Sequence, residues 1–191
     1  MKLLLFAFFT FSSGIHDADT VWKIDPSNSS IVFRVSHMMI SEAVGRFREF
    51  SGSLTHNKED FSDATVEVSI SAKSITTDNS DRDDHLRSGE FFHANQYPAI
   101  IFKSTSFKKI GKDTYEIQGD LTMRGQTRPV VFTGRITGIY STARGSSMGF
   151  KATTTIDRYD FGLRWNMILE GGGLNVGREV EIEARFELHR Q

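Results

Sequence analysis

The sequence predicts an all-β protein, either an antiparallel sandwich or a closed barrel. Apolar and polar side chains alternate with a period of two through most of the chain, as they do in a strand with one wet face. About eight such stretches follow one another with turn residues between them, which is the spacing of an antiparallel sheet. The 191 residues are enough for one sizeable domain with its own core.

The stretch from Val180 to Leu188 shows the alternation most clearly, with an apolar side chain at every second position. Because successive side chains of a strand point to opposite faces, the apolar members of each stretch should share one buried face. The other predicted strands are Val21 to Asp25, Ile31 to Val35, Gly45 to His56, Val66 to Ile70, Ala99 to Phe107, Ile117 to Met123 with a bend at Gly119, Val130 to Ile136, and Met148 to Ile156.

Composition excludes some classes of partner and of stabilisation. The net charge is −1 and the pI is near 6.6, whereas a nucleic-acid-binding protein usually has a basic surface. We therefore expect no nucleic-acid partner. There is no cysteine, so no disulfide contributes to stability, and the 16 phenylalanines supply a large apolar area for packing.

The first 18 residues have the order of a secretory signal peptide. A lysine at position 2 precedes an apolar run from Leu3 to Phe11, and small residues follow. The run is well short of the ~20 residues that span a bilayer, so we expect no stable membrane insertion. Cleavage after Gly14 or a few residues later would leave a single exported domain over residues 19–191, which we expect outside the cytoplasm, in the periplasm.

A short helical insertion is predicted near residues 80–95, where the alternation breaks. Ser80 is a candidate N-cap with Asp83 three positions later. Acidic residues crowd the first turn and Arg87 falls in the last, as the helix dipole favours. Phe91 and Phe92 follow directly, and two adjacent large aromatics there are expected either to plug one end of the barrel or sandwich, or to touch what it holds.

Two candidate reactive motifs have weak support. On the predicted helix, Asp81 and His85 share one face and His93 follows, but no established metal-ligand spacing accompanies them, so we expect no metal site there. The "GSSMG" around Ser147 matches the G-x-S-x-G pattern in form. That motif requires a strand turning into a helix, whereas an alternating strand follows here, so Ser147 is expected to be a turn residue.

Several blocks resemble the YceI-like family of bacterial exported proteins, in the same order from Trp22 almost to the C-terminus. They include "WKIDPSNSSIVFRVSHMMISEAVGRFREFSGSL", "GDLTMRGQTRPVVF", "GFKATTTIDRYDFGL" and "VGREVEIEARFEL". The most specific is the R-D-x-H-L…F-F-x-A-x-x-Y-P pattern from Arg82 to Pro98. One departure is Asn28, where the family often has histidine.

The resemblance implies a lipocalin-like fold, an antiparallel eight-stranded barrel around a long apolar tunnel. It implies binding of a polyisoprenoid, such as an isoprenoid quinone or a polyprenyl phosphate or pyrophosphate, without a cofactor and without a family-wide set of catalytic residues. A homodimer is an option that the resemblance leaves open. The residues alone do not decide whether such a barrel is filled by side chains or holds a slender ligand, because the interior of eight strands suits both.

We therefore expect an apolar lumen, with its ends lined or closed by aromatic and aliphatic residues. The expected lumen residues are Phe33, Val35, Phe47, Val68, Ile70, Phe102, Leu121, Phe132, Phe150 and Phe186. The expected residues at an end are Phe91, Phe92, Phe161, Trp165 and Leu169. A polar head group would lie at the mouth, within reach of Arg158, Arg164 or Arg178.

Three alternatives stay open at this point. The ligand could be a fatty acid or a fatty amide instead of a polyisoprenoid. The protein could be a stress-response structural protein with a filled barrel, since it would share every strand pattern. An enzyme that acts on a lipid would need a nucleophile or a base facing the lumen, and the expected lumen residues include none.

Overall fold

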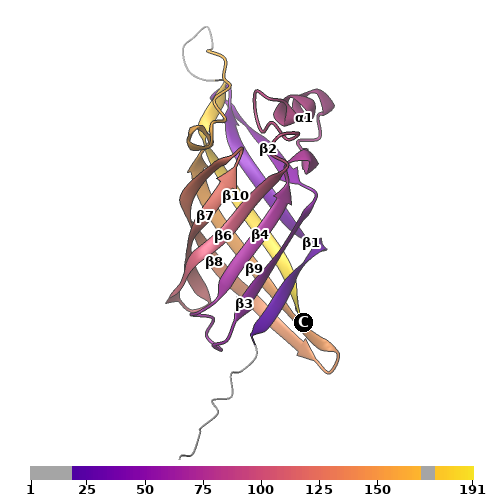
Figure 1. Cartoon of the computed structure of the whole chain (residues 1–191), viewed down its shortest axis with the longest axis vertical. Helices are drawn as coiled ribbons and strands as arrows, with labels where there is room; N and C mark the ends of the chain where they lie inside the picture. Colours follow the sequence, from indigo (N-terminus) through magenta and orange to yellow (C-terminus); the bar gives the residue numbers. More distant parts are fainter. Residues whose placement is uncertain (1–18, 169–174) are drawn as a thin grey trace, which may run out of the picture.

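The computed structural model describes residues 19–168 and 175–191, which fold mainly as strands (Figure 1). The predicted signal peptide and Leu169 lie outside the described residues. Within them the only α-helix is α1 (Ser80–Arg87), and two 3-10 turns are η1 (Ala72–Ser74) and η2 (Arg158–Phe161). The strands are β1 (Thr20–His37), β2 (Ser41–Phe47), β3 (Phe50–His56), β4 (Thr65–Ser71), β5 (Ile75–Thr76), β6 (Ala99–Gly111), β7 (Thr114–Met123), β8 (Gln126–Thr142), β9 (Gly145–Asp157) and β10 (Val176–Arg190).

Eight strands close into an antiparallel barrel, which confirms the predicted fold class. The ring runs from β1 through β3, β4 and β6 to β10, and β10 pairs back with β1. Strand β2 pairs with the C-terminal half of β1, and the short β5 pairs with the last residues of β2. Closure of the ring leaves no free sheet edge along most of the barrel, so the backbone groups of these strands have partners.

Strand β1 is long because it has two neighbours on one side. Thr20 to Lys23 pair with β3, and Ile31 to His37 pair with β2, while β10 runs along the other side. The prediction of one strand from Gly45 to His56 was wrong in this respect, because the chain breaks between Phe47 and Phe50 into β2 and β3. Between Asp25 and Ser30 the register of β1 against β10 shifts.

The bend expected at Gly119 has a steric reason. A Cβ atom on Gly119 would lie 2.5 Å from the carbonyl oxygen of Lys103 and 2.6 Å from the ring of Phe102. Real Cβ atoms do not approach so closely, so only glycine fits. The register of β6 against β7 shifts next to this point, between Ser104 and Ser106, as expected where a strand bends.

One end of the barrel lies where the C-terminus is marked in Figure 1, and buried side chains fill it. We call it the closed end. Tyr115 is 2% exposed and packs its ring 4.8 Å from that of Phe107, while its hydroxyl donates to the carbonyl of Asp60. Trp22 donates from Nε1 to Nε2 of His56, which stacks on Phe61. Other buried residues here are Leu54, Met148 and Leu188.

The opposite end carries α1 and the turns that follow β1, β7 and β9 (Figure 1), and we call it the mouth end. The predicted helix is present, but its expected N-cap was wrong by one residue. Asn79 is the N-cap, and its side chain accepts from the backbone N–H of Arg82. Ser80 is instead the first helical residue. In the described part of the chain, no helix has the length and apolar character needed to cross a membrane.

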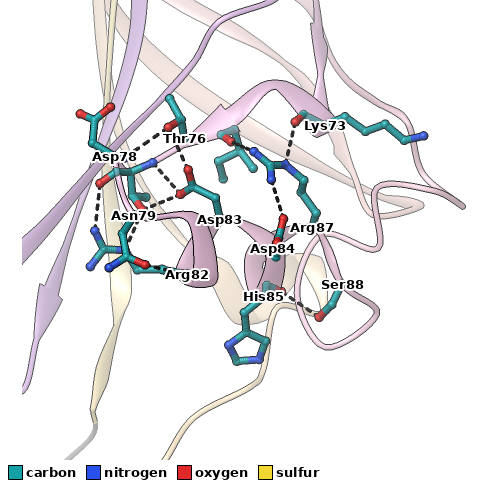
Figure 2. Close-up of polar contacts among 12 residues, drawn as sticks. Lys73, Thr76, Asp78, Asn79, Arg82, Asp83, Asp84, His85, Arg87 and Ser88 are labelled. Atoms are coloured by element: carbon teal, nitrogen blue, oxygen red, sulfur yellow. Dashed lines mark hydrogen bonds and ion pairs between the residues drawn. The ribbon is translucent and has the colours of Figure 1, made fainter.

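Asp83 anchors α1 to the barrel. The sequence predicted only a local role for it, in capping the helix and in favourable interaction with the helix dipole. Its buried carboxylate accepts from the hydroxyl of Thr76 at 2.9 Å and from the backbone N–H and hydroxyl of Thr77 at 2.7 and 2.6 Å (Figure 2). Burial raises the pKa of Asp83, but the hydrogen bonds from Thr77 and Thr76 outweigh it and hold the pKa below its ordinary value. Arg87 adds contacts to the carbonyls of Lys73 and Ile75.

We predict that Asp83→Asn lowers the free energy of unfolding by about 2 kcal/mol at neutral pH, because charge-assisted bonds to Thr76 and Thr77 are lost. Since the folded pKa of Asp83 is depressed, this stability is present above the unfolded value of about 3.9 and is lost as pH falls through the folded pKa. Urea denaturation should therefore show the gap between the two proteins shrinking in acid. Asp81→Asn, an exposed change on the same helix, should cost less than about 1 kcal/mol; equal losses for both variants would contradict this role.

Candidate ligand-binding cavity

An apolar cavity of about 170 Å³ occupies the barrel interior between its middle and the mouth end. Every residue of its lining is apolar except Arg158. The wall comes from all sides of the barrel, and α1 and the turn after it contribute the end. The lining consists of Ile31, Phe33, Val35, Phe47, Val66, Val68, Ile70, Leu86, Phe91, Phe92, Ile100, Phe102, Ile117, Leu121, Met123, Phe132, Phe150, Ala152, Ile156, Arg158, Leu163, Val176, Val180, Ile182, Ala184 and Phe186.

The structure brings all of the expected lumen residues together on this wall. They are Phe33, Val35, Phe47, Val68, Ile70, Phe102, Leu121, Phe132, Phe150 and Phe186, with Phe91 and Phe92 at the end. Two expected end residues lie outside the lining: Phe161 is 1% exposed and borders a separate polar pocket, whereas Trp165 packs against Phe91 and so helps to close the end. Leu169 is outside the described residues. Whether any of these side chains touches a ligand stays a prediction.

Phe91 and Phe92 cover the mouth end of the cavity. The backbone N–H of Phe92 donates to the carbonyl of Leu86 at 3.0 Å, which folds the segment after α1 back over the barrel. The ring of Phe92 meets that of Phe47 edge-on at 5.9 Å. Phe91 is 6% exposed because Trp165 packs 5.3 Å from it and His85 lies edge-on to both rings. The cover is thus two aromatic residues deep.

Much of the aliphatic lining was absent from the expected site. Ala152 on β9 and Ala184 on β10 are partners in the antiparallel register and lie side by side on the wall. Ile156, Val180 and Ile182 continue the wall toward the mouth end. These residues share the alternating inward face with the phenylalanines, so the strand pattern itself could have indicated them. The expected site favoured phenylalanine over the smaller inward residues. Leu163 carries no such signal, because it enters the wall from the connection between β9 and β10, and Val176 joins the wall as the first residue of β10.

Arg158 is a structural group rather than a free cation. It is 3% exposed, and its guanidinium donates to the carbonyls of Gly177, Leu163, Trp165 and Val176. Its face also lies 4.9 Å from the ring centre of Tyr159. Burial lowers the pKa of Arg158 below its usual range, although Tyr159 and Asp157 oppose this. Arg158 therefore ties both sides of the β9–β10 connection together at the cavity wall.

The other two expected head-group arginines lie in different surroundings. Arg178 is paired with Asp157, and its guanidinium lies 4.8 Å from the centre of the Tyr159 ring. Arg164 is exposed and borders a polar pocket of about 370 Å³ beside the cavity. Alternate residues of one segment line the two spaces: Leu163 faces the cavity and Arg164 the pocket. The rest of the pocket is formed by His93, Tyr97, Arg124, Gln126, Arg128, Tyr159, Asp160, Phe161 and Gly162.

The weak reactive motifs take ordinary structural places. His85 contacts Glu90 through Nε2 at 2.5 Å and uses its ring to pack against Phe91 and Trp165. The expectation that Ser147 is a turn residue was wrong, because it lies inside β9. Its Oγ is 2.9 Å from Nδ1 of His189 on β10. The elbow geometry that G-x-S-x-G requires is therefore absent at Ser147.

Comparison with known sequences identifies relatives over most of the chain. The profile of the YceI-like domain matches residues 22–188. A UPF0312 protein of Staphylococcus aureus (strain N315) is 32% identical over 170 residues, covering 88% of this chain and 96% of the relative. A UPF0312 protein of Vibrio cholerae (strain ATCC 39315 / El Tor Inaba N16961) is 32% identical over 167 residues, covering 87% and 86%.

Solved structures share the barrel at lower sequence identity. BcnA of Burkholderia cenocepacia superimposes with a TM-score of 0.74 at 20% identity, over 86% of this chain and 98% of that chain. A polyisoprenoid binding domain from Saccharophagus degradans, implicated in plant cell wall breakdown, gives a TM-score of 0.70 at 14% identity, over 89% and 98%. The YCEI protein of Campylobacter jejuni gives 0.67 at 23% identity, over 82% and 90%. At these identities the likeness shows the fold.

We predict that Arg158→Met lowers the free energy of unfolding by roughly 2–4 kcal/mol, because the carbonyls around the guanidinium lose their donors inside the protein. Hydrogen exchange should speed up in residues 159–168 and 175–178. Arg164→Met, at an exposed position of the same segment, should change stability by less than about 0.5 kcal/mol. A similar loss in both variants would show that Arg158 does not hold this connection.

Proposed function

Because the chain belongs to the family of YceI-like domains, we propose that it binds a long-chain amphiphile in the barrel cavity without chemical conversion, and that the ligand is a polyisoprenoid. The observation that carries the proposal is the lining, which is apolar on every side but for Arg158. The name of the Saccharophagus degradans neighbour, a polyisoprenoid binding domain, supports the same ligand class.

The lining suits an isoprenoid chain on physical grounds. Such a chain has no polar atoms to satisfy, so its transfer from water into an apolar cavity gains about 25 cal/mol for each Å² of apolar surface that is covered. The cavity offers only one polar side chain, Arg158, and the carbonyls of its own segment already occupy that guanidinium. A ligand with polar groups along its length would leave them unpaired, which costs free energy.

The polar head of the ligand belongs at the mouth end in this proposal. Of the three expected arginines, Arg164 is the one that borders an open polar pocket, and Arg124 and Arg128 border it too. We therefore retain Arg164 for an anionic head such as a phosphate, whereas Arg158 and Arg178 are engaged by carbonyls and by Asp157. A quinone head would need no such charge. The chemistry of the pocket thus favours, among polyisoprenoids, those with an anionic head.

The proposal excludes catalysis on the ligand for a chemical reason. The cavity wall among the described residues holds no serine, histidine, lysine or carboxylate, so no nucleophile or base faces the bound chain. The same cavity speaks against a barrel filled by its own side chains. A fatty acid or a fatty amide would suit the wall equally well, and identification of the ligand separates these cases.

Binding outside the cytoplasm is part of the proposal and rests on the leader-like order of residues 1–18. Carriage or storage of a lipid between membranes is a task for such a compartment. N-terminal sequencing of the protein from fractionated host cells would test it. We predict a mature chain that begins between residues 15 and 20 in the periplasmic or secreted fraction; an intact Met1 in the cytoplasmic fraction would contradict this part.

We predict that Ala152→Phe blocks ligand binding, because Ala152 lines the cavity and a benzyl group there would occupy the space of the chain. Uptake of a polyprenyl quinone or a polyprenyl phosphate, followed by native mass spectrometry, should weaken by about tenfold or more, equivalent to 1.4 kcal/mol. Thr155→Phe places the same ring at an exposed position of the same strand and should bind as the unmodified protein does.

Extraction of the protein from its native host should also release a lipid whose mass gives the chain length and the head group. A protein that carries no lipid and takes up neither probe would overturn the proposed function. Circular dichroism of both variants checks that a loss of uptake by Ala152→Phe does not come from unfolding, since overpacking can cost about 1–3 kcal/mol.

A further inference from the structure

A pair of like charges lies at the closed end of the barrel, away from the cavity. Asp25 on β1 and Glu187 on β10 are direct partners in the antiparallel register. Two carboxylates directly opposite each other destabilise a sheet. Among the residues that the structure describes, neither has a lysine or arginine within ion-pair distance, and each is paired only with His189. One imidazole therefore faces two carboxylates.

The two distances from His189 to the carboxylates match the separation of ligands on a common ion. Nε2 of His189 lies 3.5 Å from Oδ2 of Asp25 and 3.5 Å from Oε1 of Glu187. Charge-assisted hydrogen bonds are shorter, at about 2.7–2.9 Å. Zinc binds nitrogen and oxygen at about 2.0–2.2 Å, so two ligands of a tetrahedral ion lie about 3.3–3.5 Å apart. All three ligand atoms lie within 4.8 Å of one another.

The neighbours of His189 and Asp25 hold both in an orientation that suits metal binding. Nδ1 of His189 lies 2.9 Å from Oγ of Ser147 on β9. When this hydroxyl accepts the Nδ1–H, the lone pair of Nε2 faces the two carboxylates, which is how an outer partner fixes a metal-binding histidine. Asp25 accepts from the backbone N–H of Ser27 and from the side chain of Asn28, both at 2.9 Å.

The chain between Asp25 and Ser30, where the register against β10 shifts, supplies these donors. The carboxylate is therefore already oriented before any cation arrives, which reduces the ordering that binding requires.

We propose that Asp25, Glu187 and His189 form a binding site for a divalent transition-metal ion, zinc above all, that joins β1 to β10 at the closed end. One imidazole and two carboxylates suit zinc, whereas calcium and magnesium take oxygen ligands. Three protein ligands leave a fourth position for water. The site joins the two strands whose pairing closes the barrel, so its role is structural and independent of the lipid cavity.

Isothermal titration of the full chain, dialysed against a chelator, with zinc chloride tests the site. We expect one zinc ion per chain, and His189→Gln and Glu187→Gln should each weaken binding by at least about tenfold. Both side chains are partly exposed, at 45% and 40%, so these variants should fold. His37→Gln, at the mouth end of β1, is the matched control and should leave binding unchanged. Bound zinc should also raise the melting temperature of the unmodified chain and not of His189→Gln.

Cobalt offers a readout that does not depend on stability. A tetrahedral cobalt absorption spectrum in the unmodified chain that is lost in His189→Gln would support the assigned ligands. Ser147→Ala should weaken zinc binding by a smaller factor than His189→Gln, since Ser147 orients the imidazole without touching the ion. No saturable binding at millimolar zinc, or binding that His189→Gln and Glu187→Gln leave unchanged, would overturn the proposal.

Discussion

Pairing between β1 and β10 closes the barrel, and the cavity depends on this closure. The two strands run side by side from Trp22 and Arg190 at the closed end to His37 and Val176 at the mouth end. Each contributes alternate apolar residues to the cavity wall, from Ile31 to Val35 on one strand and from Val180 to Phe186 on the other. Without the seam, both strands would become free edges and this wall would open to water. The proposed metal site lies on the same seam, where the pairing of Asp25 with Glu187 would otherwise weaken it.

The barrel is filled over one part of its length and hollow over the other. An eight-stranded barrel has an interior that side chains can just fill, so a cavity requires that one part be left unfilled. At the closed end, Trp22, Phe107 and Tyr115 pack with their neighbours and occupy the interior. Nearer the mouth end, small residues such as Ala152 and Ala184 leave space between the aromatic rings. The filled part supports the fold, and the hollow part is free to take a ligand at little cost in packing.

The strands and their inward faces could be predicted because alternation is a local property of the sequence. The depth of a residue along the barrel could not be predicted in this way. Phe102 and Phe107 both face inward on β6, yet Phe102 lines the cavity and Phe107 packs on Tyr115 at the closed end. Two acceptors of Arg158 could not be predicted from the local sequence either, because Val176 and Gly177 follow it by 18 and 19 residues. Asp25 and His189 are 164 residues apart, and only closure of the barrel brings them together.

In the proposed function, an apolar chain occupies the hollow part of this barrel and no other part of the protein. Isotope-filtered nuclear Overhauser contacts between a polyprenyl ligand and the methyl groups of the protein test this most directly. We expect contacts to Ile100, Leu121 and Ala152 of the cavity wall, and none to Leu54 and Leu188 of the closed end or to the exposed Ile139. Contacts confined to outward-facing methyl groups, with none to the cavity wall, would contradict it.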